Sequence, residues 1–264
     1  MVEAAAPVKG TSPEGAVSEA DAAKKIREMF TLIAPRYDLL NHLLSFDLDR
    51  LWRKRAARRL RDLLQHHNAL VLDLCCGTGD LALALARVGP ACIMGADFSH
   101  SMLIRARAKI ATSHRVPSHS GLTPPPPMAL FEADALRLPF AEGTFDLVTT
   151  AFGFRNLANY EVGLREVQRI LKPGGTVAIL EFTEPPDTLF GKLYRWYFCE
   201  VLSRIGGLIS GHPAAYSYLP KSVARFFRPP ELASLMTDLG FQSVDYRTWT
   251  FGTVALHTAV RSNV

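Results

Sequence analysis

Residues 71–86, VLDLCCGTGDLALALA, predict a strand, a glycine turn and a helix in direct succession. The GTGDLA within them fits the loose dinucleotide pattern G-x-G-x-x-A, and Gly77 and Gly79 allow a ligand to approach the backbone closely. Asp73 and Asp80 flank these glycines, where two carboxylates would oppose the pyrophosphate that a dinucleotide turn holds. They suit a ligand with a sulfonium or an ammonium group. The turn therefore indicates an α/β fold that binds a cofactor with a cationic end.

Short apolar runs alternate with helical patterns along most of the chain. Strands are predicted at 70–75, 91–97, 128–134, 145–151 and 175–182. Helices are predicted at 79–88, 99–111, 160–171, 188–205 and 230–239. Such alternation predicts a parallel sheet covered on both faces, with right-handed connections. Residues 241–260 add two strands that break near Gly252 and form an antiparallel hairpin. The prediction is a Rossmann-like α/β fold with a mostly parallel seven-stranded sheet.

A single domain is predicted over residues 21–264, because 264 residues with 48% hydrophobic content suit one core with some additions. Residues 1–20 are rich in Ala, Pro, Gly, Ser and Glu, and a disordered tail is expected there. Residues 21–65 are predicted to form N-terminal helices, the first of which ends at Pro35. Residues 112–127 contain four consecutive prolines and are predicted to be an exposed insertion.

The second N-terminal helix, predicted over residues 47–64, carries most of the local positive charge. Its basic residues fall mostly off the apolar stripe: Arg50, Arg53, Lys54, Arg58, Arg59 and Arg61. Two interpretations remain open, a solvated face or a contact with anionic lipid head groups. The net charge of +5 is too small to indicate a nucleic-acid partner by itself.

Membrane spanning and export are not indicated. No run approaches the roughly 18 apolar residues of a membrane span. The first 20 residues hold no apolar segment of a secretory signal. The four cysteines include no C-x-x-C pair, so they show neither metal spacing nor a disulfide framework. We expect a cytoplasmic protein with reduced thiols and no metal site.

Three further strand ends carry candidate ligand contacts. Asp97 ends the second predicted strand, 20 residues after Gly77, where a carboxylate can accept hydrogen bonds from both ribose hydroxyls. After the third strand, Asp134 could accept from an adenine amino group, and the Ala135 N–H could donate to a ring nitrogen. The fourth strand runs directly into the loop of FDLVTTAFGFRN, residues 145–156, at the edge where such sheets bind ligands.

Taken in this order and spacing, these features resemble a class I S-adenosylmethionine-dependent methyltransferase. The motifs that carry the resemblance are the acidic glycine loop, Asp97, EADALRLPF, FDLVTTAFGFRN and RILKPGGTVAILEF. The resemblance implies S-adenosylmethionine as the cofactor. The residues expected to bind it are Asp73, Gly77, Thr78, Gly79, Asp97, Asp134, Ala135 and Ala151.

A narrower resemblance extends over roughly residues 24–260. YDLLNHLLSFDLDRLW and RILKPGGTVAILEFT are similar to the two signatures of the ubiquinone/menaquinone biosynthesis C-methyltransferases, and FGFRN and the C-terminal tail also match. Four positions depart from the family pattern: Asp49 for His, Leu40 for Met, Thr183 for Ser, and Ala151 for a Ser that contacts the cofactor. The last departure removes one hydrogen bond to the cofactor.

The resemblance implies methyl transfer to a ring carbon of a polyprenylated quinol, demethylmenaquinol to menaquinol, with the ubiquinone precursor 2-methoxy-6-polyprenyl-1,4-benzoquinol as the alternative. We assign Arg155 to the quinol oxyanion, because guanidinium does not deprotonate readily, and Asn156 to positioning. Tyr37 and Asp38 lie in a signature expected to form a lid and could relay a proton. His212 is a further candidate base. Structural roles, bracing for Arg155 and helix capping for Asp38, remain open.

The substrate tail would be membrane-soluble. LFGKLYRWYFCEVLSRIGGLISG offers candidate residues for a tail channel or a face for peripheral membrane contact: Leu193, Trp196, Tyr197, Leu202, Ile205 and Leu208. Core packing and a homodimer contact are the alternatives for the same segment. An NAD-dependent oxidoreductase and an RNA methyltransferase are the competing enzyme classes. The two carboxylates beside the glycines disfavour the first, and AFGFRN in place of an N-P-P-Y type sequence disfavours the second.

Overall fold

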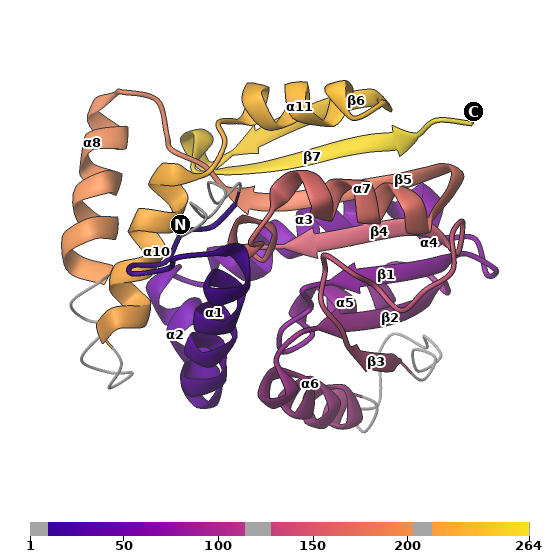
Figure 1. Ribbon diagram of the computed structural model, residues 1–264, viewed down its shortest axis with the longest axis horizontal. Helices are drawn as coiled ribbons and strands as arrows, with labels where there is room; N and C mark the ends of the chain where they lie inside the picture. Colours follow the sequence, from indigo (N-terminus) through magenta and orange to yellow (C-terminus); the bar gives the residue numbers. More distant parts are fainter. Residues whose placement is uncertain (1–9, 114–127, 203–212, 264) are drawn as a thin grey trace, which may run out of the picture.

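The computed structural model describes residues 10–113, 128–202 and 213–263. Its centre is a seven-stranded sheet in the order β3-β2-β1-β4-β5-β7-β6 (Figure 1). The strands are β1 (Leu70–Leu74), β2 (Cys92–Asp97), β3 (Ala129–Glu132), β4 (Phe145–Ala151), β5 (Leu171–Phe182), β6 (Phe241–Trp249) and β7 (Val254–Arg261). Every predicted strand is present, and β5 begins earlier than expected because Leu171 already pairs with Phe145.

The C-terminal hairpin is confirmed. β7 runs antiparallel to both β5 and β6, while the pairs among β1 to β5 are parallel. The turn between β6 and β7 includes Thr250 and Phe251 with positive φ and ends at Gly252, the predicted break. The strand order reverses between β1 and β4, so the carboxyl ends of these two strands border the crevice where doubly wound sheets bind ligands.

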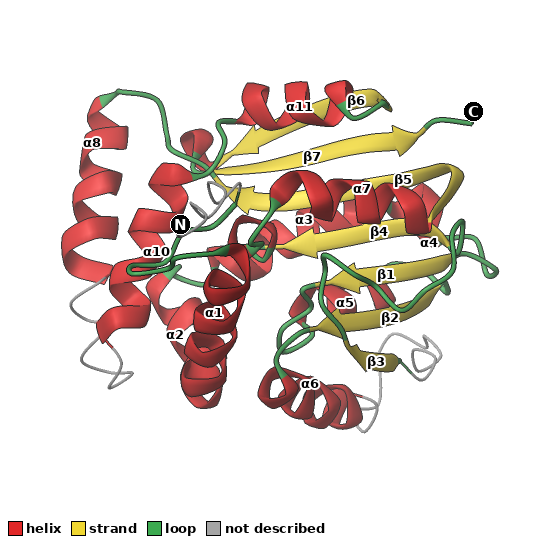
Figure 2. Ribbon diagram, in the orientation of Figure 1, coloured by secondary structure: helices red, strands yellow, loops and turns green. Residues whose placement is uncertain are grey.

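Helices cover both faces of the sheet (Figures 1 and 2). They are α1 (Glu19–Ile33), α2 (Tyr37–Leu44), α3 (Leu48–Arg59), α4 (Arg61–Leu64), α5 (Asp80–Ala86), α6 (His100–Ser113), α7 (Tyr160–Ile170), α8 (Leu189–Trp196), α10 (Pro213–Arg225) and α11 (Pro229–Asp238). One core lies between the sheet and α7 and α11, and a second lies between the sheet and α3, α4 and α5.

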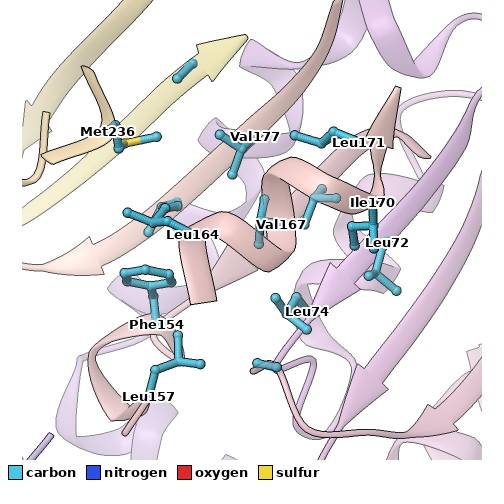
Figure 3. Packing of buried hydrophobic residues seen from close by; sticks show 14 of the residues in the cluster. Leu72, Leu74, Phe154, Leu157, Leu164, Val167, Ile170, Leu171, Val177 and Met236 are labelled. Carbon is cyan, nitrogen blue, oxygen red and sulfur yellow. The ribbon is translucent and has the colours of Figure 1, made fainter. Parts of the chain in front are cut away.

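The α7 layer shows how the sequence builds these cores. Leu164, Val167 and Ile170 recur at helical spacing, are buried, and pack with Leu72 and Val177 of the sheet (Figure 3). Asn159 caps the helix by accepting the Val162 N–H at 3.1 Å. Each such buried large aliphatic side chain stabilises the fold by about 1.5–3 kcal/mol.

Helices α1, α2, α8 and α10 lie beyond the carboxyl ends of the parallel strands (Figure 1). Helix α1 ends at Ile33 and a short 3-10 turn containing Pro35 follows, as predicted. Residues 37–44 and 213–225 form helices that were not predicted from the sequence. The predicted helix over 47–64 breaks at Leu60, and the one over 188–205 is α-helical only to Trp196, followed by a π-helical turn to Leu202.

The disordered tail predicted over residues 1–20 is wrong for its described part, residues 10–20. Thr11 is buried and its N–H donates to the Leu157 carbonyl at 2.8 Å. Gly10 lies so close to the backbone of residues 157–158 that a Cβ there would be 2.3 Å from the Leu157 oxygen. Gly10 and Thr11 therefore pack against the backbone of residues 157–158. The Pro-rich insertion, apart from its first two residues in α6, and His212 lie outside the described residues.

Candidate active site

Three adjoining cavities lie at the carboxyl ends of the parallel strands. The sheet-edge cavity is lined by residues that include Asp97, Phe98 and Asp134, the polar cavity by Arg53, Asp73 and Asp80, and the apolar cavity by Trp52, Arg155 and Phe182. Tyr37, the first residue of α2, lines all three. Phe30 and Phe152 are shared by the sheet-edge and apolar cavities. The sheet-edge and polar cavities share Cys75, Gly77 and Ala151.

The glycine turn is held by the carboxylate at the end of β2. Asp97 accepts the Gly77 N–H and the Ser99 N–H, both at 2.9 Å. Burial raises the pKa of Asp97 to about 6, although these two hydrogen bonds oppose the shift. The other glycine, Gly79, has a φ of 84° and caps α5 against Ala106, so it shapes the turn without lining a cavity.

Asp73 lies under the turn and is almost completely buried. It accepts the Ala82 N–H at 2.9 Å and the Thr149 hydroxyl at 3.2 Å, and it lines the polar cavity. Burial raises its pKa to about 7, although both hydrogen bonds oppose the shift. A carboxyl in this state gains from a cation placed in the polar cavity.

Two non-glycine residues with positive φ lie where the first and fourth strands end. Cys75 has a φ of 54° and Phe152 a φ of 61°. The loops press together here, because a Cβ on Gly153 would lie 2.4 Å from the Cys75 Cβ. Burial raises the pKa of the Cys75 thiol well above its ordinary value, so this cysteine stays protonated. Strained backbone held by close packing is typical of ligand sites.

The far end of the sheet-edge cavity is mostly apolar. Phe98 and Met102 line it together with Asp134 and the buried Ala135. The Asp134 Oδ1 accepts the Leu136 N–H at 2.9 Å, which fixes the turn after β3. A flat heterocycle fits an environment that has apolar walls and one carboxylate at its edge.

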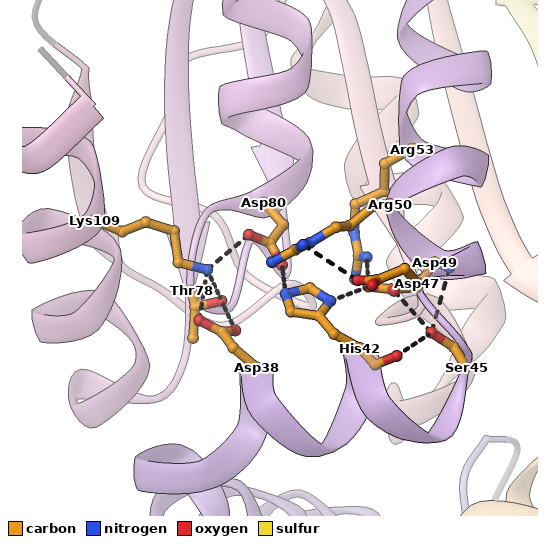
Figure 4. A network of polar contacts seen from close by, with 10 residues as sticks. All are labelled: Asp38, His42, Ser45, Asp47, Asp49, Arg50, Arg53, Thr78, Asp80 and Lys109. Carbon is orange, nitrogen blue, oxygen red and sulfur yellow. Dashed lines mark hydrogen bonds and ion pairs between the residues drawn. The ribbon is translucent and has the colours of Figure 1, made fainter. Parts of the chain in front are cut away.

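The lid helix α2 is tied to the glycine turn (Figure 4). Asp38 accepts the Thr78 hydroxyl, and its other oxygen lies 2.6 Å from the Lys109 ammonium. Lys109 also lies 2.7 Å from Asp80. We call this set of contacts the latch. Asp38, His42 and Asp80 have the spacing of a metal site, but the Lys109 charge already occupies it.

Arg53 was missed as a site residue because the helical pattern assigned it to an exposed basic face. It is buried and pairs with Asp49 (Figure 4). Together with Asp73 and Asp80 it lines the polar cavity. Burial would raise the pKa of Asp80, but the charges of Arg53 and Lys109 outweigh that effect and lower it. The polar cavity thus presents carboxylates and a guanidinium together. The departure Asp49 explains how Arg53 is held there.

Arg155 and its neighbour Asn156 face different cavities. Arg155 lines the apolar cavity, where its Nη1 lies 2.6 Å from Glu181 and donates to the Phe152 carbonyl. Burial would lower the pKa of Arg155, but the charge of Glu181 outweighs it, so the pKa lies above its ordinary value. Asn156 lines the sheet-edge cavity and accepts from the Tyr218 hydroxyl at 3.0 Å.

Tyr37 stands between these groups. Burial raises the pKa of Tyr37, and the charges of Arg53 and Arg155 oppose the shift only partly. Its hydroxyl is therefore a hydrogen-bond donor at neutral pH. Asp38 does not line the apolar cavity, so the two neighbouring candidates are separated, one at the junction and one in the latch.

The apolar cavity is walled by aromatic and aliphatic side chains from α2, α3 and α8. Of the six residues predicted for a tail channel, Tyr197 lines it, whereas Leu193 and Trp196 are exposed. The side chain of Leu202 and residues 205 and 208 lie outside the described residues. In the described part of the chain, no helix has the length and apolar character to cross a bilayer.

The donor set fits S-adenosylmethionine group by group. Asp97 matches a ribose diol, the apolar end beside Asp134 matches adenine, and Asp73 and Asp80 match an ammonium group. Arg53 matches a carboxylate. An NAD-dependent turn would not present this pair of carboxylates, one buried and one half-buried, to a pyrophosphate. The sheet order and this site define a class I methyltransferase.

The model of the ubiE/COQ5 methyltransferase family matches residues 18–261, and the chain belongs to that family. It is 49% identical over 235 residues to a demethylmenaquinone methyltransferase of Thermus thermophilus, covering 88% of this chain and 100% of the relative. It is 44% identical to a ubiquinone/menaquinone biosynthesis C-methyltransferase of Geobacter sulfurreducens, over 89% and 88% of the two chains.

Solved structures support the fold. A methyltransferase from Aquifex aeolicus superposes with a TM-score of 0.56 at 19% identity, covering 85% of this chain and 97% of the other. The sheet, the C-terminal hairpin and the family predicted from the sequence are confirmed.

Proposed function

We propose that the chain uses S-adenosylmethionine to methylate a ring carbon of a polyprenylated quinol, converting demethylmenaquinol to menaquinol. Membership of the ubiE/COQ5 family and the names of its relatives support this reaction. The observation that carries it is the meeting of the apolar cavity and the sheet-edge cavity at Tyr37 and Phe152. A greasy acceptor and a polar donor can then share one contact point without water between them.

In this proposal, four side chains hold the cofactor. Asp97 and Asp134 orient its ribose and adenine, Asp80 and Arg53 its amino-acid end. When bound, S-adenosylmethionine supplies a methyl group on a positively charged sulfur. Residues Gly77, Thr78, Ala135 and Ala151 form the surrounding wall, and Asp73 stabilises the cationic end from below. Where Ala151 replaces a serine, the wall offers no hydroxyl.

The acceptor carbon needs an electron-rich ring, which an ionised quinol provides and a quinone does not. Arg155 stabilises the quinol oxyanion through its charge, and Tyr37 donates a hydrogen bond to the same oxygen. Asn156 lines the sheet-edge cavity, and in this proposal it positions the sulfur end of the cofactor. A bond forms between the ring carbon and the methyl carbon as the bond between the methyl carbon and sulfur breaks. The same ring carbon then loses its proton to water or to a side chain near the mouth of the apolar cavity.

Methylation of 2-methoxy-6-polyprenyl-1,4-benzoquinol is the second candidate. One relative is named for both ubiquinone and menaquinone biosynthesis, which keeps this acceptor open. A cytoplasmic location with peripheral membrane contact is part of the proposal, because the tail of either acceptor is bilayer-soluble.

An anaerobic assay with methyl-labelled S-adenosylmethionine tests the proposal. Reduced demethylmenaquinol, the ubiquinol precursor and bulk RNA are offered in separate reactions, and lipid and RNA products are counted. We expect label in the naphthoquinol. Label in both lipids would make the enzyme a shared one. Label in RNA, or in neither lipid while the cofactor still binds, would contradict the proposal.

A further inference from the structure

Helix α2 has two apolar faces. Leu40 and Leu44 are buried against the protein, as expected for a packed helix. Leu39 and Leu43, spaced at i and i+4 on α2, are each more than half exposed, and Phe46, just beyond the end of the helix, is 73% exposed. These three apolar side chains lie together in the sequence and are left in contact with water, which favours a partner on that side.

Helix α8 repeats this pattern on the other side of the cavity. Phe190 and Tyr194 line the apolar cavity, and Tyr197 follows at the same spacing. Leu189, Leu193 and Trp196 form a second stripe at i, i+4 and i+7, and each is more than half exposed. Two of the helices that border the apolar cavity, α2 and α8, therefore turn some apolar side chains inward and others outward.

Ring contacts join the inner and outer surfaces. Phe46 lies 5.9 Å from the Tyr197 ring, and Phe251, which is 76% exposed, lies 4.6 Å from the Phe190 ring. The Tyr197 hydroxyl donates to the Leu44 carbonyl at 3.0 Å, which connects the end of α2 to the end of α8. Phe46 is exposed and also lines the apolar cavity. We call the exposed apolar set the docking face: Leu39, Leu43, Phe46, Leu189, Leu193, Trp196 and Phe251.

Positive charge lies on the elements that carry the docking face. Lys192, next to Leu193 on α8, is exposed and forms no ion pair within the described ranges. Arg195 of the same helix pairs with Asp187, and Arg50 of α3 pairs with Asp47, the residue after Phe46. Apolar side chains that include a Trp, accompanied by lysine and arginine, match the boundary between acyl chains and anionic head groups.

We propose that the docking face seats on an anionic lipid bilayer and that the prenyl tail passes from the acyl layer directly into the apolar cavity. This inference rests on the proposed function, because the tail defines what the cavity holds. A second copy of the chain fits the face less well. A two-fold interface over this patch would bring the same basic side chains together and close the mouth of the cavity.

Flotation with vesicles of phosphatidylcholine and phosphatidylglycerol tests the docking face. The variant is Leu193→Gln with Trp196→Gln. The matched control is Ile104→Gln with Val162→Gln, which alters two exposed apolar residues on α6 and α7. We expect the variant to lose about tenfold or more in vesicle partitioning and the control to match the parent. Equal flotation of variant and parent would overturn the inference.

Two further measurements separate the possible failures. A water-soluble quinol with a truncated tail should be methylated equally by parent and variant, while a long-tail quinol in vesicles should be methylated at least about tenfold more slowly by the variant. Loss of short-tail activity in the parent would contradict the proposed function instead. Sedimentation equilibrium completes the set: a parent dimer that the variant dissociates, with flotation unchanged, would assign the face to a second copy.

Discussion

Arg155 shows how a single charge is fixed in this site. Glu181 neutralises it at 2.6 Å, and the Phe152 carbonyl and the Ser222 hydroxyl hold two more of its N–H groups. Such bracing was the structural alternative for this residue, and the contacts are compatible with both roles. An arginine that is both braced and lining a cavity is preorganised, because it does not need to move when charge develops beside it.

The first prediction concerns Arg155→Ala. We expect cofactor affinity to stay near that of the parent and kcat to fall about 10²–10³-fold, because the quinol oxyanion loses its counter-charge. The substitution should also destabilise the fold by about 3–5 kcal/mol, since Glu181 is left buried and unpaired. Titration calorimetry measures the cofactor affinity, and single-turnover rates measure the loss of methyl transfer.

A double variant is the control for the Arg155→Ala prediction. Arg155→Ala with Glu181→Gln should recover thermal stability while kcat stays low. Recovery of kcat along with stability would show that Arg155 acts only as a brace.

The second prediction concerns Arg53→Met, with Lys54→Met as the exposed neighbour for comparison. We expect Arg53→Met to weaken S-adenosylmethionine binding about 10- to 100-fold, because a charge-assisted contact to its carboxylate is removed. Binding of methylthioadenosine, which lacks the amino-acid end, should be unaffected in both variants. Equal weakening for the two ligands would instead indicate that Arg53 only supports the fold of the cavity.

At the scale of elements, the sequence predicted the strands and the helices between them well, because their periodicity is local. It did not predict α2, because this eight-residue helix lies between the predicted helix end at Pro35 and the predicted helix start at residue 47 and is too short to show a clear helical period. Nor could it place Arg53, whose burial depends on α5 and the glycine turn packing against α3. Glu181 and Tyr218 were missed because strand and helix patterns do not reveal what a polar residue contacts across the chain.

The third prediction concerns the N-terminal segment that packs beside the β4 loop. Thr11 contacts the Tyr218 hydroxyl, which donates to Asn156, so this segment supports the loop that lines the sheet-edge cavity. Gly10→Val should push the segment away, destabilise the fold by about 1–3 kcal/mol and raise the KM for the cofactor. Chemical denaturation and steady-state kinetics check this.

Ala20→Val, on the exposed side of α1, is the control and should leave both quantities unchanged. An unaltered KM for Gly10→Val would show that the segment is not coupled to the site.

At the scale of the whole molecule, the buried carboxyl groups of Asp73 and Asp97 lower the stability of the cofactor-free protein at neutral pH, and a bound cationic cofactor offsets this loss. The folded-state pKa values of Asp73 and Asp97 are raised to about 7 and about 6. Between pH 4 and 7 the folded protein therefore binds more protons than the unfolded chain. The stability that comes from this extra proton binding at Asp73 and Asp97 is fully present below pH about 4, and it is lost as the pH rises to about 7.

The fourth prediction follows from the direction of this pH dependence. In the cofactor-free protein at pH 8, Asp73→Asn should raise the unfolding temperature, by an amount equivalent to at most about 4 kcal/mol for a pKa raised from 3.8 to about 7. At pH 4 the gain should vanish. Thermal melts at both pH values measure it.

Asp146→Asn is the opposite-sign control. Asp146 accepts the Leu70 N–H and pairs with Lys172, and its pKa is lowered, so this variant should lose stability at pH 8. A gain for Asp73→Asn of equal size at both pH values would contradict the assignment.

The wall that α8 contributes has a consequence for protein engineering. None of its residues lines the sheet-edge or the polar cavity, whereas Tyr37 of α2 lines all three. Libraries that vary Phe190, Tyr194 and Tyr197 can therefore redirect the choice of acceptor while leaving the methyl donor's contacts intact. Tyr37 is the position where such libraries should hold the parental residue, because any change there alters donor and acceptor sites at once.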